Sequence, residues 1–95
     1  MSKYNFPKIV VTGMGTVNPV GNNLDDFWKN LLDGKSGAGP ITRFDASDFK
    51  SQFACEVKDF DVTDFLTPKE ARRMDLFTHF ALASAEMAVK DAEID

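Results

Sequence analysis

The chain has 95 residues, of which 43% are hydrophobic and 27% are charged, so its length and composition suit one small globular domain. Its net charge of −4 argues against general nucleic-acid binding, because a phosphate backbone attracts a basic surface. No stretch has the roughly 20 apolar residues that span a bilayer, no signal peptide is visible, and a single cysteine favours the reducing cytoplasm.

The first predicted element is a strand formed by the β-branched run Ile9, Val10 and Val11. A short apolar run without alternation is typical of a strand that is buried on both faces, in the centre of a sheet covered by helices. Gly13 and Gly15 follow the strand and allow backbone conformations or close approaches that a side chain forbids.

An amphipathic helix is predicted from Leu24 to Leu32. Asn22 or Asn23 can cap its N-terminus, and Gly34 stands where a glycine commonly ends a helix. The apolar face of this helix, which we expect to be buried, consists of Leu24, Phe27, Trp28, Leu31 and Leu32.

Residues 41–64 have little periodicity, and a short strand at 54–57 is the main element predicted there. An irregular stretch of this length is typical of a functional or packing loop that lies over a larger body.

A second helical region begins at Thr67, where Pro68 suits the first helical position and Glu70 completes a capping box. The helical pattern continues to about Ala92, with a possible restart at Asp75. Small side chains make one surface of this region suitable for close packing: Ala81, Ala83, Ala85 and Ala88.

Two residues have side chains that often take part in catalysis, and we interpret both as structural. Cys55 is followed by Glu56, whose carboxylate disfavours a thiolate. His79 has no Cys, Asp or Glu at a spacing that indicates a ligand set. The sequence therefore predicts no catalytic triad and no metal site.

The glycines near the N-terminus resemble part of a dinucleotide-binding fingerprint. Asn18 occupies the place of the third glycine, and a turn at Pro19 and Gly21 separates the glycines from the next helix. A dinucleotide-binding module is therefore only an unfavoured alternative, and we expect no cofactor.

Three basic residues, Lys69, Arg72 and Arg73, share one helix face in this acidic chain. One interpretation is a solvated face with salt bridges to Glu70 or to nearby aspartates, and the other is docking of an acidic partner. The residues alone favour the solvated face.

Four stretches of the sequence together resemble one protein family. They are VVTGMGTVNPVG, FWKNLLDGKSGAGPITRFDASDF, FACEVKDFD and PKEARRMDLFTHFALASAEMAVKDA. From about Lys8 to Asp95, the chain is similar to the N-terminal segment of bacterial β-ketoacyl-[acyl-carrier-protein] synthases, most of all to the elongating type called synthase II. Cys55 stands where that family usually has glycine, and Glu93 stands near another usual glycine.

The resemblance implies an α/β fold, with residues 1–95 as the incomplete N-terminal portion of a thiolase-like layered α-β-α-β-α synthase domain. It implies an acyltransferase of fatty acid biosynthesis that extends acyl chains on acyl carrier protein by decarboxylative Claisen condensation with malonyl carrier protein. The expected enzyme is a cytoplasmic homodimer that needs no cofactor and binds neither nucleic acid nor membrane.

The family's nucleophilic cysteine and two histidines match no position in these 95 residues, so the chain alone is expected to be inactive. Lys69, Arg72 and Arg73 match family positions that contact the acidic carrier protein, and the resemblance thus reverses the preference in favour of docking. A non-catalytic docking or chain-length partner related to the synthases remains the alternative.

Overall fold

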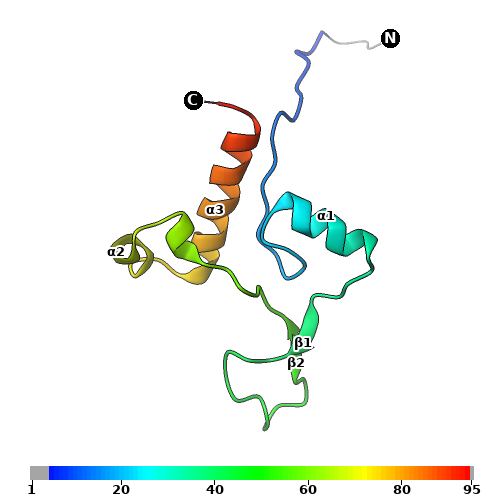
Figure 1. Cartoon of the computed structure of the whole chain (residues 1–95), viewed down its shortest axis with the longest axis vertical. Helices are drawn as coiled ribbons and strands as arrows, with labels where there is room; N and C mark the ends of the chain where they lie inside the picture. The colour runs from blue at the N-terminus through cyan, green and yellow to red at the C-terminus, as the bar shows by residue number, and fades with distance from the viewer. Residues whose placement is uncertain (1–4, 95) are drawn as a thin grey trace.

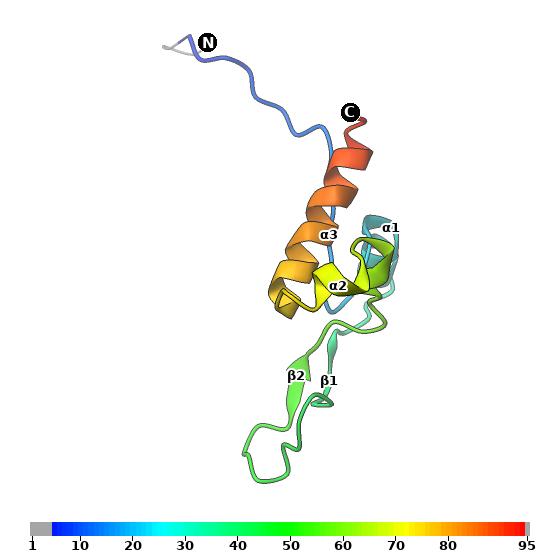
Figure 2. The same ribbon diagram turned by 90° about the vertical axis from the view of Figure 1, so that its left-hand side faces the viewer.

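The computed structural model describes residues 5–94 (Figure 1). Its elements, in chain order, are α1 (Leu24–Leu32), β1 (Ala38–Pro40), β2 (Phe53–Cys55), the 3-10 helix η1 (Val62–Asp64), α2 (Pro68–Ala71) and α3 (Leu76–Asp91). The two strands form an antiparallel hairpin that projects away from the helices, as the perpendicular view in Figure 2 shows.

The chain is more extended than an independent domain of this length. Its radius of gyration is 17.6 Å, against about 12 Å expected for a compact domain. Within residues 5–94, the buried hydrophobic residues are Ala46, at 8% exposure, and Ala83, at 0%. The described residues therefore make local contacts but do not enclose a common hydrophobic core.

The predicted buried strand at Ile9, Val10 and Val11 is wrong for the described residues. The three side chains are 89%, 66% and 80% exposed, and residues 5–17 run as extended chain with no strand paired to them in the described part of the molecule. A central strand needs neighbours on both edges, and the hairpin that residues 5–94 contain lies elsewhere (Figure 1).

The two glycines after this stretch lie against α3, and the predicted close approach is confirmed. A Cβ atom at Gly15 would lie 2.7 Å from Met87 Cβ and 2.9 Å from Ala88 N, and would also clash with the Ser84 carbonyl. The absence of a side chain at Gly15 thus lets this backbone segment pack directly on α3.

Helix α1 begins and ends where the sequence predicts. The Asn23 side chain accepts a hydrogen bond from Asp26 N at 2.8 Å, and Gly34 follows the helix with φ of +70°. The prediction that the apolar face is buried is wrong for the described residues, because Trp28 is 61% exposed and Leu32 69% exposed. Leu24 and Phe27 on the same face are half-buried, so residues 5–94 cover it only in part.

The strand predicted at 54–57 is present as β2, which begins one residue earlier, at Phe53, and ends two residues earlier, at Cys55. It pairs with β1 in the register Ala38↔Cys55, Gly39↔Ala54 and Pro40↔Phe53. The Glu56 carboxylate closes the intervening loop by accepting a hydrogen bond from the Thr42 hydroxyl at 2.8 Å, and this bond lowers the pKa of Glu56.

Helices η1, α2 and α3 meet around a small aromatic cluster. The ring of Phe60 stacks on Phe65 at a centroid distance of 6.0 Å and meets Phe80 edge-on at 5.4 Å. Aromatic pairs at these distances add to the free energy gained by burying their area. The cluster therefore anchors η1 to α3 and brings α2 alongside (Figure 2).

Candidate docking surface on helix α2

Helix α2 starts with the capping box that the sequence predicts. Thr67 Oγ1 accepts a hydrogen bond from Glu70 N at 3.2 Å, and Glu70 Oε1 accepts hydrogen bonds from Thr67 N at 3.3 Å and Thr67 Oγ1 at 2.8 Å. Pro68 occupies the first turn, where its missing N–H costs nothing. The predicted restart is also confirmed, since Asp75 is the N-cap residue of α3.

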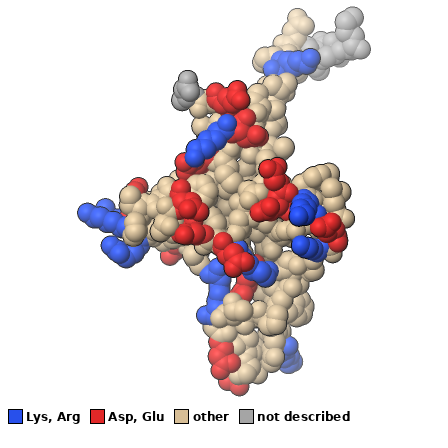
Figure 3. Space-filling model, viewed as in Figure 1, with Lys and Arg blue, Asp and Glu red and all other residues tan. Residues whose placement is uncertain are grey.

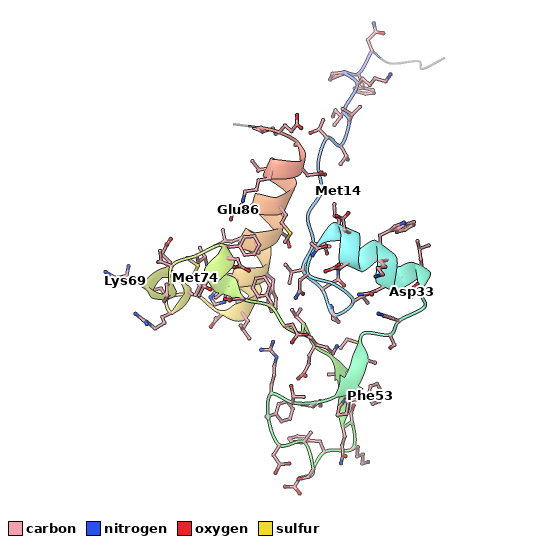
Figure 4. The ribbon with its side chains drawn as sticks, in the orientation of Figure 1. Met14, Asp33, Phe53, Lys69, Met74 and Glu86 are labelled. Atoms are coloured by element: carbon pink, nitrogen blue, oxygen red, sulfur yellow. The ribbon has the colours of Figure 1, made fainter. Side chains whose placement is uncertain are left out.

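The α2 cations, which are Lys69, Arg72 and Arg73, all lie at this projecting end of the molecule. Lys69 is inside α2, and Arg72 is its C-cap residue with helical backbone angles. All three residues are exposed. In Figure 3, Lys and Arg side chains gather at the left-hand tip, over α2, and Figure 4 shows Lys69 at the outermost point of that tip.

The α2 cations have no acidic partner among residues 5–94, where the ion pair that does form is Lys90–Glu86 at 3.2 Å. Glu70, the acidic residue nearest in sequence, is engaged elsewhere. Its pKa is lowered by the hydrogen bond from the Thr67 hydroxyl and by the bond from the Thr67 backbone. The cations are therefore free to meet a negative group from outside, and the interpretation of a salt-bridged face does not hold for the described residues.

His79 is buried, at 8% exposure, and its Nε2 atom lies 2.8 Å from the Ala71 carbonyl oxygen. A carbonyl oxygen only accepts, so Nε2 carries the proton and donates it. The structural interpretation of His79 is confirmed. Its partner could not be read from the residues, because a backbone carbonyl is present at every position of the chain.

Cys55 lies on β2, opposite Ala38, and its thiol is free and exposed. Beside it, Glu56 is bound to Thr42. His79 is on α3, outside the hairpin, so the two residues belong to different parts of the fold (Figure 1). No group of three or more potential metal ligands occurs among residues 5–94.

The glycine turn near the N-terminus is arranged for packing. Met14 N donates to the Asp91 carboxylate at 3.0 Å, which places a negative charge where a pyrophosphate would need positive potential. The turn predicted between the glycines and α1 is present: Asn18 and Gly21 form a bridge, and Val20 N donates to Asn18 Oδ1 at 2.8 Å. These contacts disfavour dinucleotide binding.

The helices found in residues 5–94 include none with the length and apolar character required to traverse a bilayer.

Comparison with known proteins gives the family. Residues 7–95 match the family model described as "Beta-ketoacyl synthase, N-terminal domain". The chain therefore belongs to the β-ketoacyl synthase family, and the resemblance drawn from its four sequence stretches is confirmed.

Particular relatives agree with this assignment. The chain is 51% identical over 94 residues to the 3-oxoacyl-[acyl-carrier-protein] synthase 2 of Synechocystis sp. (strain ATCC 27184 / PCC 6803 / Kazusa), a match that covers 99% of this chain and 23% of that protein. It is 49% identical over 88 residues to the synthase of the same name in Coxiella burnetii, covering 93% of this chain and 21% of the relative. The chain thus spans less than a quarter of the length of these curated relatives.

A solved structure supports the fold. The ishigamide ketosynthase/chain length factor superposes with a TM-score of 0.82 at 37% identity, over 90% of this chain and 21% of the solved chain. The described elements therefore form the N-terminal part of a thiolase-like α/β fold, which also accounts for the absence of a common core within residues 5–94.

Proposed function

We propose that residues 1–95 are the N-terminal part of a β-ketoacyl-[acyl-carrier-protein] synthase of the elongating type, an acyltransferase of fatty acid biosynthesis. Support comes from the names of the relatives at 51% and 49% identity. The reaction is a decarboxylative Claisen condensation, in which malonyl carrier protein loses carbon dioxide and attacks an acyl thioester on the enzyme. The nucleophile and its bases are supplied by parts of the enzyme beyond these residues.

The role of this segment is recognition of acyl carrier protein by the α2 cations. The observation that carries this role is the exposed basic tip, unpaired within residues 5–94, in a chain whose net charge is −4. Complementary charge steers encounter and fixes orientation more than it adds affinity, which suits a carrier that must dock and leave in every cycle.

We also propose that the complete enzyme is a homodimer in the cytoplasm. Large apolar side chains lie exposed on the extended segment and on α1, and a surface of this kind needs a cover. The remainder of the enzyme and a second subunit supply it. The unpaired Cys55 suits a reducing compartment.

A non-catalytic chain-length partner is the second candidate, and it is raised by the solved ketosynthase/chain length factor at 37% identity. The catalytic candidate is preferred because the relatives with higher identity are named as synthases. A complete protein that lacks the nucleophilic cysteine would settle the question in favour of the chain-length partner.

The docking role is tested by changing the α2 cations to Glu together in the complete enzyme. Exposed charge pairs are each worth about 0.2–1 kcal/mol, so kcat/KM for carrier-protein substrates should fall roughly 3- to 100-fold at low salt. The loss should shrink as salt screens the charges. Small thioester mimics, which lack the acidic carrier, should react at the parental rate.

A matched control separates local from overall charge. Reversal of the exposed residues Lys29, Lys35 and Lys50 changes the net charge by the same amount at positions outside α2. This control should leave the use of carrier protein near the parental level. An equal loss from both triple variants would show that net charge, and not the α2 surface, governs the encounter.

A further inference from the structure

Helix α2 is too short to keep its own shape. It has four residues, and isolated helices shorter than roughly 12–15 residues are marginal in water. The orientation of the α2 cations therefore depends on what holds the two ends of this helix.

The two ends are fixed by different devices. The Thr67–Glu70 capping box holds the N-terminus with side chains from the helix itself. The C-terminus is held from outside, because His79 of α3 donates to the carbonyl of Ala71, the last residue of α2. Figures 1 and 2 show α2 crossing near the start of α3, where His79 lies.

This hydrogen bond joins a buried side chain of α3 to the backbone at the base of the basic tip. His79 is 8% exposed and sits in the first turns of the 16-residue helix α3, whereas Arg72 and Arg73 follow Ala71 directly and are exposed. The Ala71 carbonyl also accepts from Met74 N at 3.2 Å, so the same oxygen anchors the turn between α2 and α3. Rotation of that carbonyl would redirect both arginines.

We propose that His79 is a positioning residue that fixes the direction in which Arg72 and Arg73 face acyl carrier protein. This inference rests on the docking function proposed above. His79 touches no substrate and acts through the Ala71 carbonyl. Its imidazole is buried, so the bond holds one orientation of the backbone that carries the two arginines and lowers the entropy that this backbone loses when the carrier binds.

The test uses His79→Leu and His79→Gln in the complete enzyme. Leu removes the donor, so KM for carrier-protein substrate should rise roughly 2- to 10-fold at low salt, the equivalent of one or two misplaced exposed pairs. The value of kcat and the reaction of a small thioester should stay parental. Gln places an amide N–H near the position of Nε2 and should restore most of the KM.

A double-mutant cycle distinguishes this inference from the docking proposal. If His79 acts through the α2 cations, His79→Leu should have no further effect once those cations have been changed to Glu. An equal rise in KM in both backgrounds would overturn the positioning role. If the Glu triple variant alone uses carrier protein normally, the docking proposal itself fails.

Two further variants distinguish loss of the His79 hydrogen bond from a general loss of stability. Gly15→Ala strains α3 on its opposite, Ser84-facing side, and it should lower the melting temperature without changing KM for carrier protein. If His79→Leu does not fold, His79→Asn replaces it, since its amide is polar but too short to reach Ala71 O. Asn and Gln variants with the same KM would overturn the proposal.

Discussion

Residues 5–34 and residues 60–94 differ in how far their apolar side chains pack against one another. In the first region, the extended segment and α1 present large apolar side chains to solvent, with Ile9 at 89% and Trp28 at 61% exposure. In the second, the cluster of Phe60, Phe65 and Phe80 packs η1 against α3, and polar caps hold the ends of α2. Both regions still expose large apolar side chains, with Phe77 of α3 at 73% exposure, but the second also contains an aromatic cluster that packs within itself.

This difference separates interactions between residues close in the sequence from interactions that need a distant surface. A cap or a capping box joins groups a few residues apart, so it forms wherever the sequence places it. An apolar face stabilises the folded protein only in proportion to the area that another surface removes from water. The α2 cations lie in the region that contains the aromatic cluster.

The largest effect is expected from Trp28→Ala in the complete enzyme, which tests whether the apolar face of α1 is covered there. If the rest of the protein covers α1, loss of this side chain should cost about 3–5 kcal/mol of unfolding free energy, as core truncations do. Phe80→Ala in the packed aromatic cluster is the reference, and the two losses should be similar by urea denaturation. A Trp28 change below about 0.5 kcal/mol, typical of surface positions, would mean that α1 stays uncovered.

The same distinction between local and distant interactions explains which features could be predicted from the sequence. The ends of α1, the capping box at Thr67 and the restart at Asp75 were predicted because each signal lies within a few residues of its partner. Burial of Ile9 and Trp28 was predicted wrongly for these residues, because burial depends on a surface that they do not contain.

The candidate site divides in the same way. The spacing of the α2 cations and the capping box were both visible in the sequence, but the residues alone still left Glu70 as a possible salt-bridge partner of the cations. The link from His79 to Ala71 was not predictable, because it depends on how α2 folds back on α3 and ends on a backbone atom. Side-chain patterns identify charged surfaces more readily than the contacts that orient them.

A smaller effect tests the contact between the two regions, where the glycine turn lies on α3. Gly15→Ala should lower the unfolding free energy by about 1–3 kcal/mol, since the added Cβ meets the Ser84 carbonyl and the backbone must move. Gly39→Ala is the matched control, because its Cβ would meet nothing within 4 Å. Thermal melting of the complete enzyme compares them, and equal shifts would show that the turn does not press on α3.

The smallest effect compares the two helix ends themselves, α1 in the first region and α3 in the second. Both end in the same backbone motif: the N–H of Gly34 bonds to Leu31 O at 3.1 Å, and the N–H of Glu93 bonds to Lys90 O at 3.1 Å. Gly34 has φ of +70° and Glu93 has φ of +57°, a left-handed conformation that suits glycine and disfavours side chains.

Reciprocal substitutions in the complete enzyme should therefore move stability in opposite directions. Glu93→Gly should raise the unfolding free energy by about 0.5–1 kcal/mol, since relief of the left-handed strain outweighs the added freedom of the unfolded chain. Gly34→Ala should lower it by a similar amount. Glu93→Ala keeps a side chain at the strained position and should leave urea unfolding unchanged. If Glu93→Ala stabilised the enzyme as much as Glu93→Gly, the gain would come from loss of the carboxylate. The conformational explanation would then be wrong.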